Sequence, residues 1–363
     1  YKRQDYYCAR WIKEFVLYTP VKIYRSLIME SFVSPEEKFP FVSVILTVKN
    51  EERTIDALIE SVLNLDYPNY EVILVDTGSS DETVHIAKKH RVKIVQTETS
   101  VPSKGRNVGI HSSSGEMVAF VDGDCRIIEK NWLRELISLL QQEGVGGVGG
   151  PVLSCDNGTY LSRALWDVFS TFFASGGSTL TARHKDQKEV KNLPSGNVIY
   201  RREVIEKVGL FNENLRFCED IDLSHRVRKA GYRLLFSPLM AVEHNWKVQS
   251  FGSMFWHMLR YGSGRANASR KCSHLFSPFY AIPSIALIGL LSIFLLSFFY
   301  RGLFMPVTVS LISMYVTVAF ISAFLAAYQF KDMRMILVAP ATYVILHLGY
   351  SIGFILGLIV GDR

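Results

Sequence analysis

Three long apolar runs fill the last quarter of this 363-residue chain and limit its possible folds more than any other feature. They lie at about residues 276–300, 303–328 and 335–360, and none of them contains an aspartate, glutamate, lysine or arginine. Each is long enough to cross a hydrocarbon core of roughly 30 Å, whereas a soluble helix would carry charge on its exposed face. We therefore expect residues 273–363 to form a transmembrane domain with three helices, in which His347 faces the bundle.

Basic residues beside these runs predict the orientation of the chain. Four precede the first run and two lie between the second and third: Arg260, Arg265, Arg270 and Lys271, then Lys331 and Arg334. Because short loops rich in Lys and Arg stay in the cytoplasm, we expect a multi-pass cell-membrane protein whose large N-terminal domain is cytoplasmic. The Arg301 turn and the C-terminal tail would lie outside. The net charge of +6 then matches membrane phosphates, and nucleic acid is not expected as a partner.

Two further segments mix apolar, aromatic and basic residues. Between residues 249 and 272, apolar side chains follow the i, i+3, i+4, i+7 spacing of one helix face: Phe251, Met254, Phe255 and Met258. This spacing predicts an amphipathic helix at the membrane interface. Residues 1–38 are expected to form a second membrane-surface arm or, because Pro20 breaks its helical pattern, a simple packing arm. The five cysteines show no CxxC pair, so we expect neither a zinc site nor a disulfide framework.

Residues 39–248 alternate β-rich runs with helical stretches. The expected strands are 42–48, 71–75, 93–96, 117–121, 198–200 and 234–236, and the expected helices are 53–65, 81–90 and 104–112. This rhythm predicts an α/β fold, an open and mostly parallel sheet with helices on both faces. In such sheets ligands bind beyond the carboxyl ends of the strands. Residues 154–193 are expected to form a loop beside that site.

Polar and acidic residues follow three of these strands. Asn50 and Glu51 come after the first, Asp76 after the second, and Asp122 and Asp124 after the run that ends at residue 121. Singly, each motif could be only a helix cap or a turn. Together they would repel one another at one sheet edge unless a cation lay between them. We therefore expect a divalent cation, Mg²⁺ or Mn²⁺, held by Asp122 and Asp124 against a diphosphate.

Other side chains are candidates for the same edge. Asp76 could bond a uracil ring or a ribose, and Lys104 and Arg106 could meet phosphate charge. Gly196 and Asn197 precede the strand at 198–200. His244 is a candidate metal ligand, although a lone histidine is more often structural.

An acidic cluster begins at Glu219 and Asp220. A carboxylate aimed into a cleft can act as a general base. Asp220 and Glu219 are the candidate catalytic residues, and Asp220 is our candidate for the base. The alternative is that Asp222 and Arg226, at i and i+4, form a helix ion pair while Glu219 caps the helix.

In this order the motifs resemble glycosyltransferase family 2, with a GT-A (Rossmann-like) fold, over about residues 41–246. They are Thr-x-x-Asn-Glu, Asp-x-Gly-Ser-x-Asp, Gly-Arg-Asn-x-Gly, Asp-x-Asp, Gly-Asn, Glu-Asp-x-Asp-Leu-x-x-Arg and a late His. The resemblance implies inverting, metal-dependent transfer of a hexose from a nucleoside diphosphate sugar. A UDP-sugar is favoured and a GDP-sugar is the alternative. It further implies roles for six residues: Thr47, Glu51, Asp76 and Asp122 at the nucleoside, Asp124 at the metal and Asp220 at the acceptor hydroxyl.

The likeness also bears on the acceptor. Synthase-like members carry Gln-x-x-Arg-Trp on the interfacial helix, which His257-Met258-Leu259-Arg260-Tyr261 only approximates. A lipid-linked acceptor, either a polyprenyl phosphate or a lipid-linked glycan, is therefore favoured over processive polysaccharide synthesis. Arg260, Tyr261 and Arg265 are expected at the membrane interface near it. A non-catalytic sugar-nucleotide-binding scaffold is a third possibility, but such a protein would be expected to lack the acids that this chain retains.

Overall fold

The computed structural model describes residues 39–99, 101–154, 159–176 and 186–361. Internal contacts divide the chain into Tyr1–Pro40 and Phe41–Arg363, and the second unit contains all the helices and strands of the described residues. The predicted arm of residues 1–38 lies outside the described residues.

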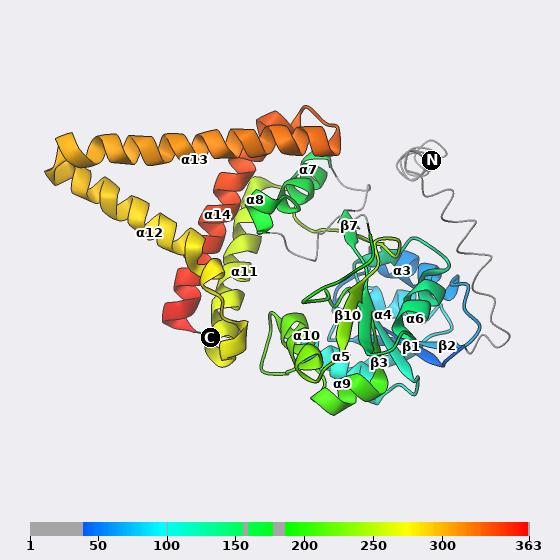
Figure 1. Ribbon diagram of the computed structural model, residues 1–363. Coiled ribbons are helices and arrows are strands. Elements are labelled where there is room, and N and C mark those ends of the chain that lie inside the picture. The colour runs from blue at the N-terminus through cyan, green and yellow to red at the C-terminus, as the bar shows by residue number, and fades with distance from the viewer. Residues whose placement is uncertain (1–38, 100, 155–158, 177–185, 362–363) are drawn as a thin grey trace. The chain divides into compact units, whose positions relative to one another are not determined.

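An eight-stranded sheet forms the centre of the N-terminal part, in the order β3-β2-β1-β4-β9-β6-β10-β8 (Figure 1). Its strands are β1 Val42–Val48, β2 Tyr70–Asp76, β3 Lys93–Gln96, β4 Met117–Asp122, β6 Val145–Gly149, β8 Lys188–Glu189, β9 Asn197–Arg201 and β10 Arg233–Phe236. Within this sheet β9 and β8 run against the other six strands. The prediction of a mostly parallel sheet is confirmed.

Helices cover both faces of this sheet because its strands are apolar on both sides. They are α3 Ile55–Leu63, α4 Thr83–Ala87, α5 Pro102–His111, α6 Trp132–Leu140, α9 Arg202–Val208 and α10 Glu219–Lys229. Ile45 of β1 packs in one core with Ile110 of α5 and Leu223 of α10. Its neighbours Val44 and Leu46, which point to the opposite face, are also fully buried.

A separate sheet has three strands, in the order β5 Cys125–Ile127, β11 Val242–His244 and β7 Val152–Ser154. The prediction that residues 154–193 form a loop is wrong, because the segment contains α7 Tyr160–Phe169, α8 Phe172–Ser175 and β8. Thr159 caps α7 by accepting a hydrogen bond from the backbone N–H of Ser162. Residues 155–158 and 177–185 are not among the described residues.

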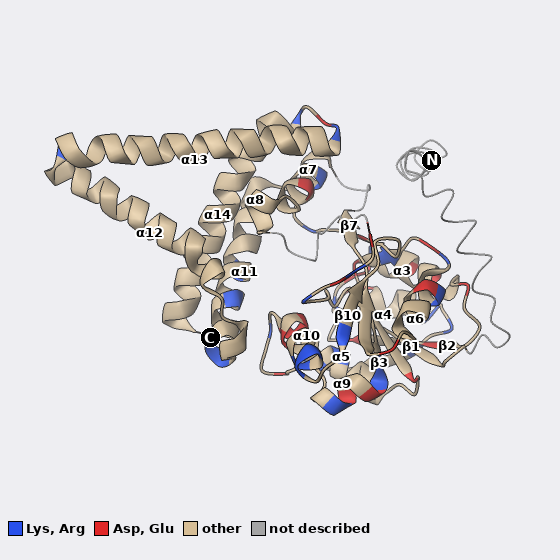
Figure 2. Cartoon of the chain, in the orientation of Figure 1, with Lys and Arg blue, Asp and Glu red and all other residues tan. Residues whose placement is uncertain are grey.

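Four long helices form the C-terminal part: α11 Phe251–Lys271, α12 Pro278–Phe299, α13 Arg301–Phe330 and α14 Met335–Val360. A short 3-10 turn, η2 Ser273–Leu275, joins the first two. The last three helices are each long and apolar enough to cross a membrane, and their bounds lie within two residues of the predicted runs. Figure 2 shows Lys, Arg, Asp and Glu only at or beyond their ends. This composition indicates membrane association.

α14 runs beside α11 in the same direction (Figure 1). Glycines make this approach possible: Gly262 of α11 and Gly349, Gly353 and Gly357 of α14. A Cβ at Gly353 would overlap the backbone oxygen of Leu259, and one at Gly262 would overlap that of Tyr350. Small residues let two helix backbones come this close.

Candidate active site

The carboxyl end of β1 lies between two acidic strand ends. In the sheet register Val48 pairs with Asp76 of β2, and Thr47 pairs with Asp122 of β4. Asp76 is only 1% exposed, and its carboxylate accepts the backbone N–H of Ser79 at 3.1 Å. The predicted convergence of these strand ends is therefore present.

The loop after β1 is held in place largely by its own polar residues. Asn50, at a φ of 54°, donates its backbone N–H to Ser79 Oγ, and its side-chain oxygen accepts the backbone N–H of Ser80. Glu51 pairs with Lys247 Nζ at 2.6 Å, and burial raises the pKa of this carboxyl above its usual value. Asn50 thus shapes the loop, while Thr47 and Glu51 line the edge.

Arg106, on α5, links the end of β4 to the start of α10. Its guanidinium is 5% exposed and donates to Asp122 Oδ1 and to Glu219 Oε1, both at 2.8 Å. Such a pair of charge-assisted bonds holds both carboxylates in fixed positions. Burial, together with Asp220 and Asp122, raises the pKa of Glu219 to about 7, although Arg106 opposes the rise.

Asp220 occupies the first turn of α10. The residue before this helix, Cys218, has a φ of 63°, a conformation that side-chain-bearing residues rarely adopt and that is often found at functional sites. Asp220 accepts the backbone N–H of Ile221 at 2.8 Å. Burial raises the pKa of Asp220, whereas this hydrogen bond and Arg265 lower it. Its position at the start of the helix and the partial exposure of the residue suit a general base.

Asp124 and His244 face each other across β5 and β11, with Oδ2 and Nε2 3.3 Å apart. Burial acts to raise the pKa of Asp124, but His244 brings it below its usual value. The other ring nitrogen of His244, Nδ1, is buried and has no hydrogen-bond partner among the described residues. The facing Nε2 and carboxylate, rather than the orphaned Nδ1, fit a divalent cation such as Mn²⁺, which accepts both oxygen and imidazole ligands.

Two protein ligands do not complete a coordination shell. Among the described residues no group of three His, Cys, Asp or Glu side chains could hold a metal, and Asp122 is paired with Arg106. The remaining ligands would have to come from the bound substrate and water, as is usual for Mg²⁺.

Aromatic rings surround the Asp124–His244 pair, the candidate cation site that we call the metal corner. The sequence patterns did not predict these rings. Trp166 of α7 lies 5.4 Å from the His244 ring and 5.0 Å from Trp246. Trp246 also meets His257 of α11 at 5.4 Å, and burial lowers the pKa of His257 to about 4. His257 is therefore neutral at physiological pH, which keeps a second positive charge away from the metal corner.

The remaining residues predicted to bind the nucleotide sugar differ in their exposure and contacts. Lys104 is exposed. Gly196 lies against the Asp122 carboxylate, whereas Asn197 is 0% exposed and its side chain forms hydrogen bonds with Trp132, Pro151 and Met240. Asn197 thus braces the sheet behind Gly196.

The helix ion pair considered as the alternative for the acidic cluster is present. Asp222 pairs with Arg226 at 2.8 Å and with His274 at 2.9 Å. Asp222 is 2% exposed, so it holds α10 to the segment after α11. This leaves Asp220 as the partly exposed member of the cluster.

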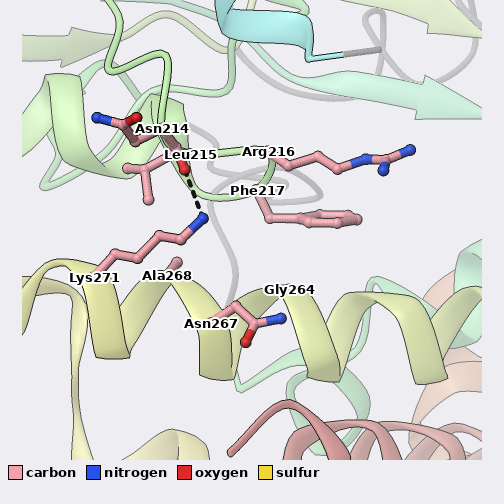
Figure 3. A pocket seen from close by; sticks show the side chains of 8 residues that line it. All are labelled: Asn214, Leu215, Arg216, Phe217, Gly264, Asn267, Ala268 and Lys271. Carbon is pink, nitrogen blue, oxygen red and sulfur yellow. Dashed lines mark hydrogen bonds between the residues drawn. The ribbon is translucent and has the colours of Figure 1, made fainter. Parts of the chain in front are cut away.

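The loop before α10 rests on α11, as Figure 3 shows. Lys271 donates to the backbone oxygen of Asn214 at 2.9 Å, and a Cβ at Gly264 would overlap Phe217. The cavity between them measures only about 10 Å³, room for about one water. The loop that leads to the candidate base is thus packed directly on α11.

The three predicted interface residues of α11 do not share one face. Arg260 is exposed and donates a long hydrogen bond, of 3.4 Å, to the backbone oxygen of Trp256. Arg265 is 5% exposed and lies near enough to Asp220 to affect its pKa. The Tyr261 ring lies 5.9 Å from the Arg265 guanidinium, and its centroid lies 6.2 Å from that of the Tyr350 ring.

Comparison with a solved structure identifies the fold. The mannosyltransferase PcManGT from Pyrobaculum calidifontis, determined with GDP-Man and Mn²⁺, is 18% identical and superposes with a TM-score of 0.53 over 91% of this chain and 93% of its own. Its likeness confirms the GT-A fold.

Sequence comparison identifies the family of the chain. Residues 43–209 match the model described as Glycosyl transferase family 2. Glycosyltransferase AglE of Haloferax volcanii is 32% identical over 237 residues, which cover 62% of this chain and 73% of that protein. The chain belongs to glycosyltransferase family 2. Beta-monoglucosyldiacylglycerol synthase of Trichormus variabilis is 28% identical over 56% of this chain, but only 45% of that protein is covered.

Proposed function

We propose that this glycosyltransferase moves a hexose, with inversion, from a nucleoside diphosphate sugar to a lipid-linked acceptor in the membrane. The observation that carries the proposal is the position of Asp220. Its helix start is tied to the nucleotide edge through Glu219 and Arg106, and its loop packs on α11, which leads into the apolar helices. The candidate base therefore lies between the strand ends that would meet a nucleotide and the helices that would meet a membrane lipid.

In the proposed reaction the Asp220 carboxylate takes the proton of an acceptor hydroxyl. The freed oxygen attacks the anomeric carbon as the bond from that carbon to the diphosphate oxygen breaks, and the nucleoside diphosphate leaves. A divalent cation, when bound by Asp124 and His244, supplies Lewis-acid stabilisation of the departing diphosphate. The buried Arg106–Glu219 pair holds the start of α10 in place during the transfer.

The donor would lie along the edge formed by β1, β2 and β4. In this proposal Asp76 and Thr47 meet the base and ribose, with Asp122 beside them, and Lys104 meets phosphate charge. The strand register that brings the first three to one edge and the exposure of Lys104 support these roles. We favour a UDP-sugar because a carboxylate can accept the imide N–H of uracil. A GDP-sugar is the alternative, and the solved mannosyltransferase was determined with GDP-Man.

Two observations support a lipid-linked acceptor and a cytoplasmic catalytic domain. The loop before α10 packs on α11, which itself packs along an apolar helix, and basic residues gather at the ends of the apolar segments (Figure 2). Such residues favour the cytoplasmic face. The similarity to a synthase named for a glucosyl lipid points the same way.

The test is transfer of radiolabelled sugar from UDP- and GDP-sugars to membrane lipid extract, with Mn²⁺ or Mg²⁺ present. Asp220→Asn should lower turnover about 10²- to 10⁴-fold while nucleotide binding, followed by thermal shift, survives. Glu206→Gln, a change at an exposed carboxylate of α9, is the control and should leave turnover unchanged.

Two results would count against the proposal. Unchanged turnover of Asp220→Asn would refute the assignment of the base. Label that never enters the organic phase, from any donor, would refute the lipid-linked acceptor.

A further inference from the structure

Arg265 is a buried arginine whose charge has no counterion among the described residues. It lies in α11 at 5% exposure, and within the described ranges neither Nε nor Nη1 has a hydrogen-bond partner. Nη2 reaches Tyr261 Oη, at 3.4 Å. Arginine stays charged in proteins, and a buried charge without a partner is costly. Arg106, the other buried arginine of the described residues, is paired with two carboxylates.

The groups around Arg265 are suited to hold an anion. Its guanidinium lies 4.2 Å from the ring centre of Tyr280 on α12 and 5.9 Å from that of Tyr261. The hydroxyl of Tyr350 on α14 is also buried and finds no partner in the described ranges. Asp220 influences Arg265 electrostatically but forms no ion pair with it within the described part of the chain. Guanidinium and hydroxyl donors together match the several acceptor oxygens of a phosphate.

The position of this cluster indicates which phosphate it would take. α11 meets the metal corner through His257 and Trp246, and Arg265 lies two turns further along, on the side of Asp220. An inverting transfer places the attacking oxygen and the leaving diphosphate on opposite sides of the anomeric carbon. A cationic site on the base side therefore belongs to the acceptor. Its lining comes from α11, α12 and α14 and not from the nucleotide edge of the sheet.

We propose that Arg265, with the hydroxyls of Tyr261 and Tyr350, binds the phosphate group that joins the acceptor to its lipid. This inference rests on the proposed function, since it assumes a lipid-linked acceptor and inversion. It adds that the enzyme selects a lipid phosphate or diphosphate over an uncharged glycolipid. Arg265 positions the acceptor hydroxyl at Asp220 and takes no part in proton transfer.

The experiment measures binding to the full chain in phosphatidylcholine nanodiscs. A polyprenyl monophosphate and the corresponding uncharged polyprenol are titrated, and binding is followed by intrinsic tryptophan fluorescence. We expect the wild-type protein to prefer the phosphate, and Arg265→Gln to weaken phosphate binding about 10- to 100-fold, the usual range for a lost charged hydrogen bond. Polyprenol binding should not change. Arg270→Gln, which removes an exposed charge of the same helix, is the matched control and should keep the preference.

Two further arms separate the sources of phosphate. UDP and GDP with Mn²⁺ should bind Arg265→Gln as they bind the wild-type protein. An equal loss for nucleotide would assign the site to the donor diphosphate and overturn the proposal. Inorganic pyrophosphate should compete only weakly, and competition as strong as that of the polyprenyl phosphate would overturn the lipid assignment.

Other variants keep the inference testable if Arg265→Gln folds poorly. Tyr350→Phe removes only the buried hydroxyl and should weaken phosphate binding a few-fold, whereas Arg265→Lys keeps the charge and should lose less than Gln. An unchanged affinity in both variants would overturn the proposal. If sugar still reaches the lipid extract with an unaltered KM for lipid in Arg265→Gln, this inference fails while the proposed function stands.

Discussion

The helices α12 and α13 differ from α14 in their surroundings, although all three are apolar and long enough to cross a membrane. Of the most apolar stretch of each helix, 11% is buried in α12 and 17% in α13, but 44% in α14. The buried face of α14 meets α11 along one half and α7 and α8 along the other. Composition alone does not separate a helix that faces lipid from one that packs on the catalytic part.

The difference predicts how often the chain crosses the membrane. α11 carries Arg260, Arg265 and Arg270, and charge in the hydrocarbon core is costly. Because α14 lies along α11 in the same direction, we expect α14 to remain at the interface, so that only α12 and α13 cross. The charge pattern of the sequence instead predicts three crossings and a C-terminal tail outside.

The largest expected effect is on the side of the membrane where the end of α14 lies. The test is an epitope inserted at Gly361, beyond α14. In sealed vesicles it should be accessible from the same side as an epitope in α9, while one at Gly302, at the start of α13, should be accessible from the other side. The measurement is antibody binding before and after permeabilisation. A Gly361 epitope found on the side of Gly302 would show that α14 crosses.

The next largest effect is expected from paired glycine substitutions. Gly353→Leu places a side chain where the backbone of Leu259 already lies, so it should separate α14 from α11 and cost about 3 kcal/mol or more. Gly289→Leu, on α12, points into open space, with no atom of the described residues within 4 Å of the added Cβ. We expect the first variant to lose most of its transferase activity and several degrees of thermal midpoint. The second should match the wild-type protein in both assays, and equal behaviour would contradict the docked position of α14.

The elements of this fold were easier to predict from the sequence than their contacts. The strand ends at Asp76 and Asp122 and the apolar runs were predictable because each follows from a local period. The pairing of Arg106 with Glu219 joins residues 113 positions apart, and the docking of α14 on α11 requires glycines of both helices. The first contact leaves no local pattern. For the second, the four-residue spacing of Gly349, Gly353 and Gly357 indicates a face for close helix packing but does not identify its partner helix.

Two parts of the site were missed for a related reason. Strands β5, β7 and β11 have only three residues each, too few for a visible alternation. Trp166, which covers His244, lies in a segment that was expected to be a loop. The lone histidine gained its significance only from the tertiary partners Asp124 and Trp166.

A smaller effect on thermal stability is expected when single hydrogen bonds are removed from α14, which packs on the catalytic part, and from the more exposed α13. His347 of α14 accepts from Tyr315 of α13 at 2.8 Å and donates Nε2–H to the backbone oxygen of Phe173 at 2.9 Å. His347→Leu would leave both partners unpaired and should cost about 1–3 kcal/mol. Thr317→Val, on α13, removes only a bond to the same helix, from an exposed side chain. Thermal denaturation in detergent should show a lower midpoint for the first variant alone, and equal midpoints would mean that the α14 contacts add no stability.

The smallest expected effect is on the pH dependence of turnover. α14 packs on α11, the helix that carries Arg265 near Asp220. A general base must be ionised, so turnover falls on the acid side as Asp220 takes up a proton. Burial raises the pKa of Asp220, and the charge of Arg265 lowers it. Without that charge the pKa rises further, so in Arg265→Gln the acid limb of the kcat profile should move to higher pH.

The profile is measured at saturating acceptor, which removes any effect of weaker lipid binding. In the control variant Arg270→Gln the limb should stay in place. The Arg270 guanidinium donates to the backbone oxygen of Gly357, and Arg270 is not among the largest influences on the pKa of Asp220, whereas Arg265 and Arg106 are. An acid limb that stays fixed in Arg265→Gln would mean that Arg265 does not act on the base. A limb that moves equally in both variants would mean that the net charge of α11 sets it, and that the burial of one arginine against the docked helix has no special effect.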